Sequence, residues 1–130
     1  MSKIKKVIVF GGGGFLGSHV ADQLNEKGYS VTIFDIKESK YINNKQKMII
    51  GDILDKKEVN KAIKGHQLVY HFAGIADINE AKKKPVETVT SNILGTTNIL
   101  EACRINKIDR IIFASTIYVY SELGSFYRSS

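Results

Sequence analysis

The sequence predicts an α/β protein with a mostly parallel sheet of about five strands and helices on both of its faces. Short β-branched apolar runs alternate along the chain with amphipathic stretches of helical period. The connections between them are short, and parallel strands need crossovers that cover both faces of the sheet. Four consecutive glycines stand directly between the first apolar run and the first amphipathic stretch, where a tight strand-to-helix turn is expected.

The first three strands are expected in the N-terminal half of the chain. Residues 4–10 (IKKVIVF) form an apolar run that the glycines end, as in a buried parallel strand. Over residues 15–27 apolar side chains recur at helical spacing, and Gly28 follows as a helix-stopping residue. Residues 31–34 predict a second strand that ends at Asp35, and residues 48–50 predict a short third one.

A second helix and a fourth strand follow. Residues 55–64 have an N-cap in Asp55 and an apolar stripe of Val59, Ala62 and Ile63, which together predict a helix. Residues 68–72 predict the fourth strand, and we expect a loop over residues 73–84.

A long helix and a fifth strand are expected in the C-terminal half. The helix runs from about Val86 to Asn106, with Pro85 at its start, where proline is tolerated. One face of this amphipathic helix carries Val89, Ile93, Thr97, Leu100 and Arg104. Residues 110–115 open the fifth strand, which we expect to continue toward Val119 before a final loop.

The length and composition of residues 1–130 are those of one globular domain or of a piece of something larger. Hydrophobic residues make up 43% and charged residues 25% of the chain, which excludes intrinsic disorder. The net charge of +6 comes from scattered lysines without interleaved aromatic residues, so we expect no nucleic-acid partner. No apolar run is long enough to cross a membrane, and the single cysteine, Cys103, suits a reducing compartment. We therefore expect a cytoplasmic protein with no membrane partner.

The glycine-rich turn predicts a dinucleotide-binding site. Gly11, Gly14 and Gly17 form a G-x-x-G-x-x-G pattern between strand and helix. Missing side chains permit positive φ and close approach of a pyrophosphate, which then faces the N-terminus of the helix. A flexible turn without a ligand is the alternative interpretation of a glycine cluster.

Asp35 supports the dinucleotide interpretation. It stands at the end of the second strand, 18 residues after Gly17, where a carboxylate can accept hydrogen bonds from the adenosine ribose. A 2′-phosphate would be repelled there, which favours NAD over NADP, although Lys37 and Lys40 leave NADP open. The alternative is that Asp35 only forms a turn.

Five ordered motifs carry a family resemblance over essentially the whole chain. They are GGGGFLGSH, GDILD, YHFAG, NILGTTNILEACR and FASTIYVYS. They resemble the extended short-chain dehydrogenase/reductases, which include NAD-dependent nucleotide-sugar epimerases and dehydratases. The resemblance implies a Rossmann-like doubly wound fold that is truncated at its C-terminus. The cofactor-binding positions that it implies are Gly11, Gly14, Phe15, Leu16, Gly17, Asp35, Asp52, Ile53, Phe72, Ala73, Gly74, Asn92 and Ser115.

The resemblance also implies where catalysis would take place. The family's catalytic hydroxyl falls on Thr116, which could hydrogen-bond the substrate oxygen while hydride moves. The family's base is the tyrosine of Y-x-x-x-K, here Tyr127, but the chain stops one residue before the lysine position. Without that ammonium, a phenol with an ordinary pKa near 10 is a poorly activated base. Tyr127 also follows Thr116 by only 11 residues, so it could instead belong to a tail.

The function expected from these features is the NAD-binding portion of a nucleotide-sugar epimerase similar to UDP-glucose 4-epimerase. Ile117 and Tyr118 replace the acidic pair of the dehydratases, so epimerase or reductase chemistry fits better. We expect little or no turnover by these 130 residues alone and no metal site. The resemblance implies a homodimer formed through the long helix after Pro85 and a further helix that would begin at Tyr127. A sugar-nucleotide reductase of the same family and a non-catalytic dinucleotide-binding or regulatory protein are the alternatives.

Overall fold

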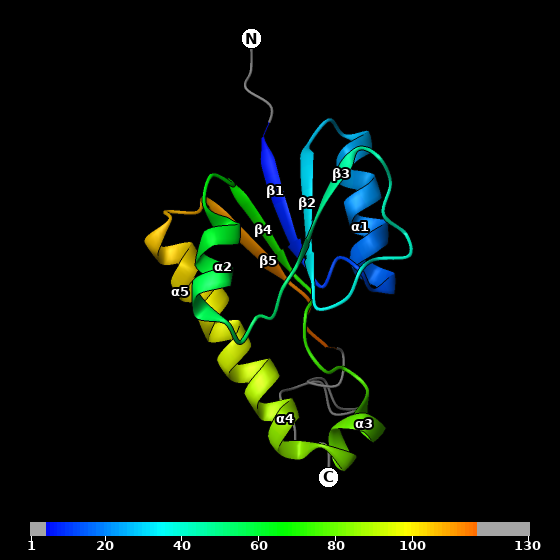
Figure 1. The fold of residues 1–130 in the computed structure, drawn as a ribbon, viewed down its shortest axis with the longest axis vertical. Helices are drawn as coiled ribbons and strands as arrows, with labels where there is room; N and C mark the ends of the chain where they lie inside the picture. Colours follow the sequence, from blue (N-terminus) through cyan, green and yellow to red (C-terminus); the bar gives the residue numbers. More distant parts are fainter. Residues whose placement is uncertain (1–4, 117–130) are drawn as a thin grey trace, which may run out of the picture.

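The fold contains one five-stranded parallel sheet with the strand order β3-β2-β1-β4-β5, seen in a computed structural model that describes residues 5–116. Figure 1 shows the strands running side by side with their carboxyl ends at one edge of the sheet. The strands are β1 (Lys6–Phe10), β2 (Ser30–Asp35), β3 (Gln46–Ile50), β4 (Leu68–His71) and β5 (Arg110–Phe113). The predicted α/β fold is confirmed.

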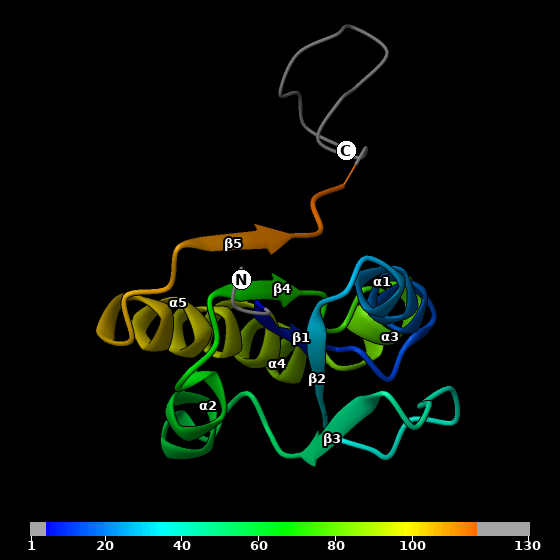
Figure 2. The same cartoon turned by 90° about the horizontal axis from the view of Figure 1, so that it is seen from above.

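Helices cover both faces of this sheet (Figure 2). The helix α1 (Phe15–Glu26) packs through Ala21 and Leu24 onto one face of β1 and β2. The helices α2 (Lys56–Ile63) and α5 (Thr96–Ile105) pack onto the other face. The β1 side chains alternate between the two cores, because successive strand residues point to opposite faces. None of the helices described over residues 5–116 is long and apolar enough to cross a membrane.

The segment after β4 differs from the prediction. A short helix, α3 (Ile78–Lys83), occupies the second half of the expected loop. Its N-cap is Asp77, whose carboxylate accepts a hydrogen bond from the backbone N–H of Glu80 at 2.7 Å. An aspartate followed three residues later by a glutamate is a capping-box-like signal, and this signal was available in the sequence.

The predicted long helix is one continuous helical rod with three parts. The helix α4 (Pro85–Val89) leads into a π-helical turn, η1 (Thr90–Gly95), and then into α5. A π-turn carries one extra residue, so it rotates the following side chains relative to a regular α-helix. The helical spacing of apolar residues in the sequence does not distinguish a π-turn from a regular α-helix, so this irregularity was not predicted.

The apolar stripe predicted on this helix faces outward. Val89 and Ile93 are 56% and 63% exposed, and Leu100 is 48% exposed. The buried face instead carries small or polar residues, namely Gly95, Asn98, Ala102 and Cys103, together with the fully buried Ile99. Small residues on that face let α5 approach the sheet and the loop after β3 closely.

The fifth strand is shorter than predicted. It ends at Phe113, and Ala114, Ser115 and Thr116 continue it without regular strand pairing. The expected continuation toward Val119, the substituted positions Ile117 and Tyr118, and Tyr127 all lie outside the described residues.

Candidate functional site

The carboxyl ends of the five parallel strands place most of the predicted site residues at one edge of the sheet. The glycine-rich turn follows β1, Asp35 ends β2 and Asp52 follows β3. Residues 72–74 follow β4, and residues 114–116 follow β5. Open α/β sheets bind ligands at this edge, next to the point where the strand order reverses. Here that point lies beside β1, which pairs with both β2 and β4.

The backbone of the glycine turn lies very close to the segment after β4. Gly11 has φ +76°, and a Cβ atom built on it would lie 2.6 Å from the backbone N of Ala73. A Cβ on Gly17 would lie 2.7 Å from Gly12 Cα and would also overlap the Gly11 carbonyl oxygen. These two positions admit only glycine without a backbone shift, which explains the spacing of the motif.

The N-terminus of α1 is open toward the cleft. Gly14 is the N-cap, and no side chain among residues 5–116 caps the first-turn N–H groups. Such groups are ready donors to an anion, and the helix dipole favours negative charge there.

Asp35 is held at this edge by backbone donors. Its Oδ2 accepts a hydrogen bond from Gly13 N–H at 2.9 Å, and its Oδ1 accepts one from Ile36 N–H at 2.8 Å. Each carboxylate oxygen has a second lone pair, so Asp35 can still accept hydrogen bonds from a ligand. Lys37 lines the same cleft.

A cleft of about 690 Å³ runs across these elements. That volume falls within the range of ligand sites, roughly 300–1,000 Å³. The predicted residues that line it are Gly11, Gly14, Asp35, Asp52, Ile53, Phe72, Ala73 and Gly74. Phe15 and Leu16 do not line it: they are exposed at the first turn of α1, where the Phe15 ring lies edge-on to His19.

The turn after β3 forms one end of this cleft. Asp52 Oδ1 accepts a hydrogen bond from the Leu54 N–H at 2.9 Å, and the Asp55 N–H donates to the Asp52 carbonyl at 3.0 Å. The Ile53 side chain is only 8% exposed and belongs to the core beneath the turn.

A second cavity, of about 610 Å³, lies between the ends of β4 and β5 and shares residues 72–75 with the cleft. Ser115, Thr116 and Asn92 line it. The side-chain amide of Asn92 pairs with the backbone of Ile75, accepting from its N–H at 2.8 Å and donating to its carbonyl at 2.9 Å. The π-turn therefore carries the side chain that fastens the segment after β4.

Several lining residues were missed by the sequence reasoning. His71 lies on the floor of the second cavity, with Nε2 2.8 Å from Thr96 Oγ1, and burial lowers the pKa of its imidazole. Glu80 and Lys84 reach the first cleft because α3 replaces the predicted loop. Over residues 5–116 the structure has no cluster of three or more side chains suited to hold a metal ion.

The fold and this site together define a dinucleotide-binding α/β domain of the Rossmann type, and the comparisons identify its family. A profile of the NAD dependent epimerase/dehydratase family matches residues 7–129, so the chain belongs to that family.

Three known proteins illustrate the relationship. The chain is 36% identical over 124 residues to a UDP-N-acetyl-alpha-D-glucosaminuronate decarboxylase of Bacillus cytotoxicus, covering 91% of this chain and 38% of the relative. It is 34% identical over 122 residues to a decarboxylating sterol-4-alpha-carboxylate 3-dehydrogenase of Mus musculus, covering 94% and 33%. The crystal structure of the Thermus thermophilus UDP-glucose 4-epimerase in complex with NAD superposes with a TM-score of 0.80 and 32% identity, covering 85% and 37%. The chain thus spans between 33% and 38% of the length of these proteins.

Proposed function

We propose that this chain forms the NAD-binding part of a nucleotide-sugar epimerase similar to UDP-glucose 4-epimerase. The observation that carries the proposal is the cleft itself, in which the open N-terminus of α1, the Asp35 carboxylate and the turn after β3 line one continuous surface. These groups suit a diphosphate, a ribose and an adenine in that order. The Thermus epimerase, whose structure contains NAD, supports the choice of cofactor.

The proposed roles follow the geometry. Gly11, Gly14 and Gly17 let the backbone approach the diphosphate. Phe15 and Leu16, whose side chains lie outside the cleft, would contribute only their backbone N–H groups at the start of α1. Asp35 accepts hydrogen bonds from the ribose hydroxyls, and its charge disfavours a 2′-phosphate.

The remaining proposed contacts extend from the adenine to the nicotinamide. Asp52 and Ile53 contact the adenine at one end of the cleft. Residues 72–74 lie beneath the cofactor, and Asn92 and Ser115 support the nicotinamide end.

Cofactor binding is tested by calorimetric titration of the chain with NAD and with NADP. We expect NAD to bind more tightly than NADP, and Asp35→Ala to weaken NAD binding at least about tenfold, because a single hydrogen bond to a charged acceptor is worth about 1.5–3 kcal/mol. Asp109→Ala is the matched control, because it removes the same charge from an exposed position outside both cavities. Unchanged NAD affinity in Asp35→Ala would remove the assignment of the ribose site.

For the chemistry, we propose transient oxidation of a sugar carbinol to a ketone and its reduction from either face, for which a bound NAD would supply the hydride acceptor and donor. Thr116 would hold the substrate oxygen beside Ser115, at the end of the second cavity. Tyr127 would take the hydroxyl proton. We expect the 130 residues by themselves to bind the cofactor with little or no turnover, and an assay with UDP-glucose and NAD that gave full epimerase rates would contradict this.

We further propose that the protein forms a homodimer through the outward face of the helical rod α4–η1–α5. Val89, Ile93 and Leu100 leave an apolar stripe exposed on that face, and exposed apolar patches commonly mark interaction sites. Analytical ultracentrifugation tests this, with Ile93→Lys expected to shift the protein to a monomer. Tyr41→Lys is the control, because it replaces an exposed apolar side chain in the connection between β2 and β3, outside the helical rod.

A further inference from the structure

Asn98 is an unexpected residue for the middle of a buried helical face. Asparagine is a poor helix former, and buried asparagines are uncommon. Yet Asn98 lies within α5 and is only 8% exposed. A polar side chain in this place needs a partner outside its own helix.

Its partners belong to the turn that lines one end of the cleft. Asn98 Nδ2 donates hydrogen bonds to the carbonyl oxygens of Ile53 at 3.0 Å and Leu54 at 3.3 Å, about 45 residues earlier in the chain. Both carbonyls therefore point toward α5, away from the cleft that Ile53 and Leu54 line.

The peptide group between Ile53 and Leu54 is held from two sides. Asn98 holds its carbonyl oxygen, and Asp52 Oδ1 accepts from its N–H at 2.9 Å. A peptide group is planar, so fixing both of its polar atoms fixes its orientation.

Gly95, one helical turn before Asn98, makes this arrangement possible. A Cβ atom on Gly95 would lie 2.7 Å from Ile53 Cγ1 and would overlap the Ile53 Cδ1 atom. Glycine at this position therefore lets α5 approach the turn until the Asn98 amide reaches its carbonyls.

We propose that Asn98 is a positioning residue for the adenosine end of the cofactor cleft, acting through the Ile53–Leu54 peptide group. This inference rests on the proposed function, because it assumes that the turn contacts an adenine. It predicts that a residue without any contact to the ligand controls the affinity for the adenosine half of NAD.

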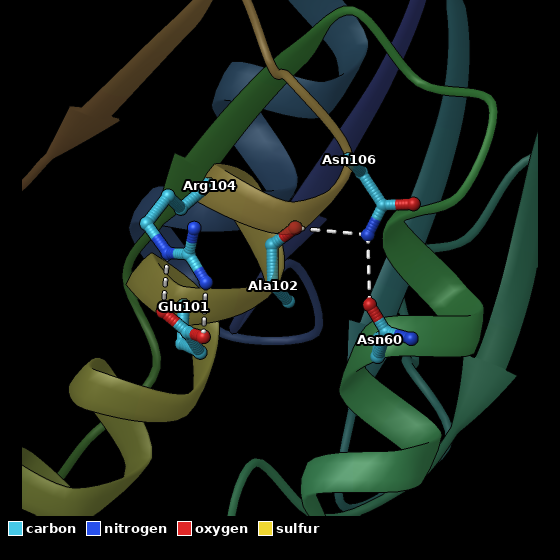
Figure 3. A network of polar contacts seen from close by, with 5 residues as sticks. All are labelled: Asn60, Glu101, Ala102, Arg104 and Asn106. Atoms are coloured by element: carbon cyan, nitrogen blue, oxygen red, sulfur yellow. Dashed lines mark hydrogen bonds and ion pairs between the residues drawn. The ribbon is translucent and has the colours of Figure 1, made fainter.

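The test compares a variant within α5 with one at its C-cap. Asn98→Leu keeps the branched shape and the number of side-chain heavy atoms but leaves both carbonyls without their donor. Asn106→Leu is the matched control. The Asn106 side-chain amide donates hydrogen bonds to Asn60 Oδ1 in α2 and to the Ala102 carbonyl, both at 2.8 Å (Figure 3). Neither of these partners lines the cleft. AMP serves as the probe, because it contains only the adenosine end of the cofactor.

We expect Asn98→Leu to weaken AMP binding about tenfold, the effect of losing about one hydrogen bond between the displaced turn and the ligand, and Asn106→Leu to change it less than twofold. Both affinities are measured well below each variant's unfolding temperature. Equal losses in the two variants would overturn the proposal, because they would reflect loss of stability alone. If Asn98→Leu does not fold, Asn98→Ala replaces it, since its smaller side chain lets water reach both carbonyls, and a threefold or larger loss is then expected.

Amide hydrogen exchange supplies a readout that does not depend on a ligand. We expect exchange of the Leu54 N–H to accelerate at least tenfold in Asn98→Leu and to stay unchanged in Asn106→Leu. If the wild-type chain binds neither AMP nor NAD, the proposed function fails. Leu54 exchange then decides by itself whether Asn98 positions the turn, and unchanged exchange refutes it.

Discussion

The close approach of Gly11 to the segment after β4 gives a quantitative prediction for Gly11→Ala. Two costs add in this variant. A non-glycine residue at φ +76° is strained by about 1–2 kcal/mol. The new Cβ would also lie 2.6 Å from Ala73 N, where ordinary contact begins at 3.4 Å. Overpacking of this kind costs about 1–3 kcal/mol because the partner is backbone and cannot rotate away.

Gly28→Ala separates the two costs. Gly28 has φ +84°, nearly the same backbone conformation, but nothing lies within 4 Å of a Cβ built on it. We therefore expect Gly28→Ala to lower the free energy of unfolding by about 1–2 kcal/mol and Gly11→Ala by about 2–5 kcal/mol.

Urea denaturation followed by circular dichroism measures both values, and titration with NAD measures the consequence for the site. Gly28→Ala is expected to bind NAD like the wild-type chain, because its position lies at the opposite end of α1 from the glycine turn. Equal destabilisation by the two substitutions would refute the reasoning, since it would leave no cost for the contact between the turn and residues 72–73.

Two further predictions concern groups whose pKa values are shifted. The pKa of His66 is lowered mainly by burial, so this side chain binds a proton more readily in the unfolded chain than in the folded one. The free energy of unfolding should therefore fall as the pH drops below about 6.5. His66→Gln should flatten this pH dependence, and His19→Gln, at an exposed position, is the control. Burial raises the pKa of the Cys103 thiol from its ordinary value of 9.0 to about 11, so alkylation by iodoacetamide at pH 8 should be at least about a hundredfold slower in the folded chain than in urea; comparable rates would show that Cys103 is accessible.

The strands and the glycine turn were predictable because their signals are local. The β1 run of Val7, Ile8 and Val9 is buried on both faces of the sheet, so its sequence is continuously apolar. The glycine at position 11 is required by the backbone conformation at that same residue. In both cases the structural requirement, burial or a positive φ, acts on the same residue whose type makes the prediction possible.

The buried face of the long helix was not predictable from its apolar period. Counting apolar residues selects Val89, Ile93 and Leu100, whose side chains are exposed and available for a partner. The packed face uses Gly95 and Asn98, which a hydrophobicity pattern ignores or counts as polar. Gly95 and Asn98 are needed because α5 packs against the turn after β3, and this turn lies next to α5 only in the folded chain.

The groups proposed to touch the cofactor are oriented by residues elsewhere in the chain. They are mostly backbone atoms and two carboxylates, Asp35 and Asp52, at the ends of strands. Hydrogen bonds from other residues set their directions: Gly13 N–H orients Asp35, Asn92 fastens Ile75, and Asn98 holds the Ile53 carbonyl.

Asn92 and Asn98 both lie on the helical rod, in η1 and α5, on the two sides of Gly95. A shift of this rod would therefore move the adenosine end and the nicotinamide end of the cleft together. If the outward face of the same rod joins two copies of the protein, dimer formation and cofactor binding share one structural element, and NAD affinity should fall in any variant that tilts the rod, even when every residue lining the cleft is intact.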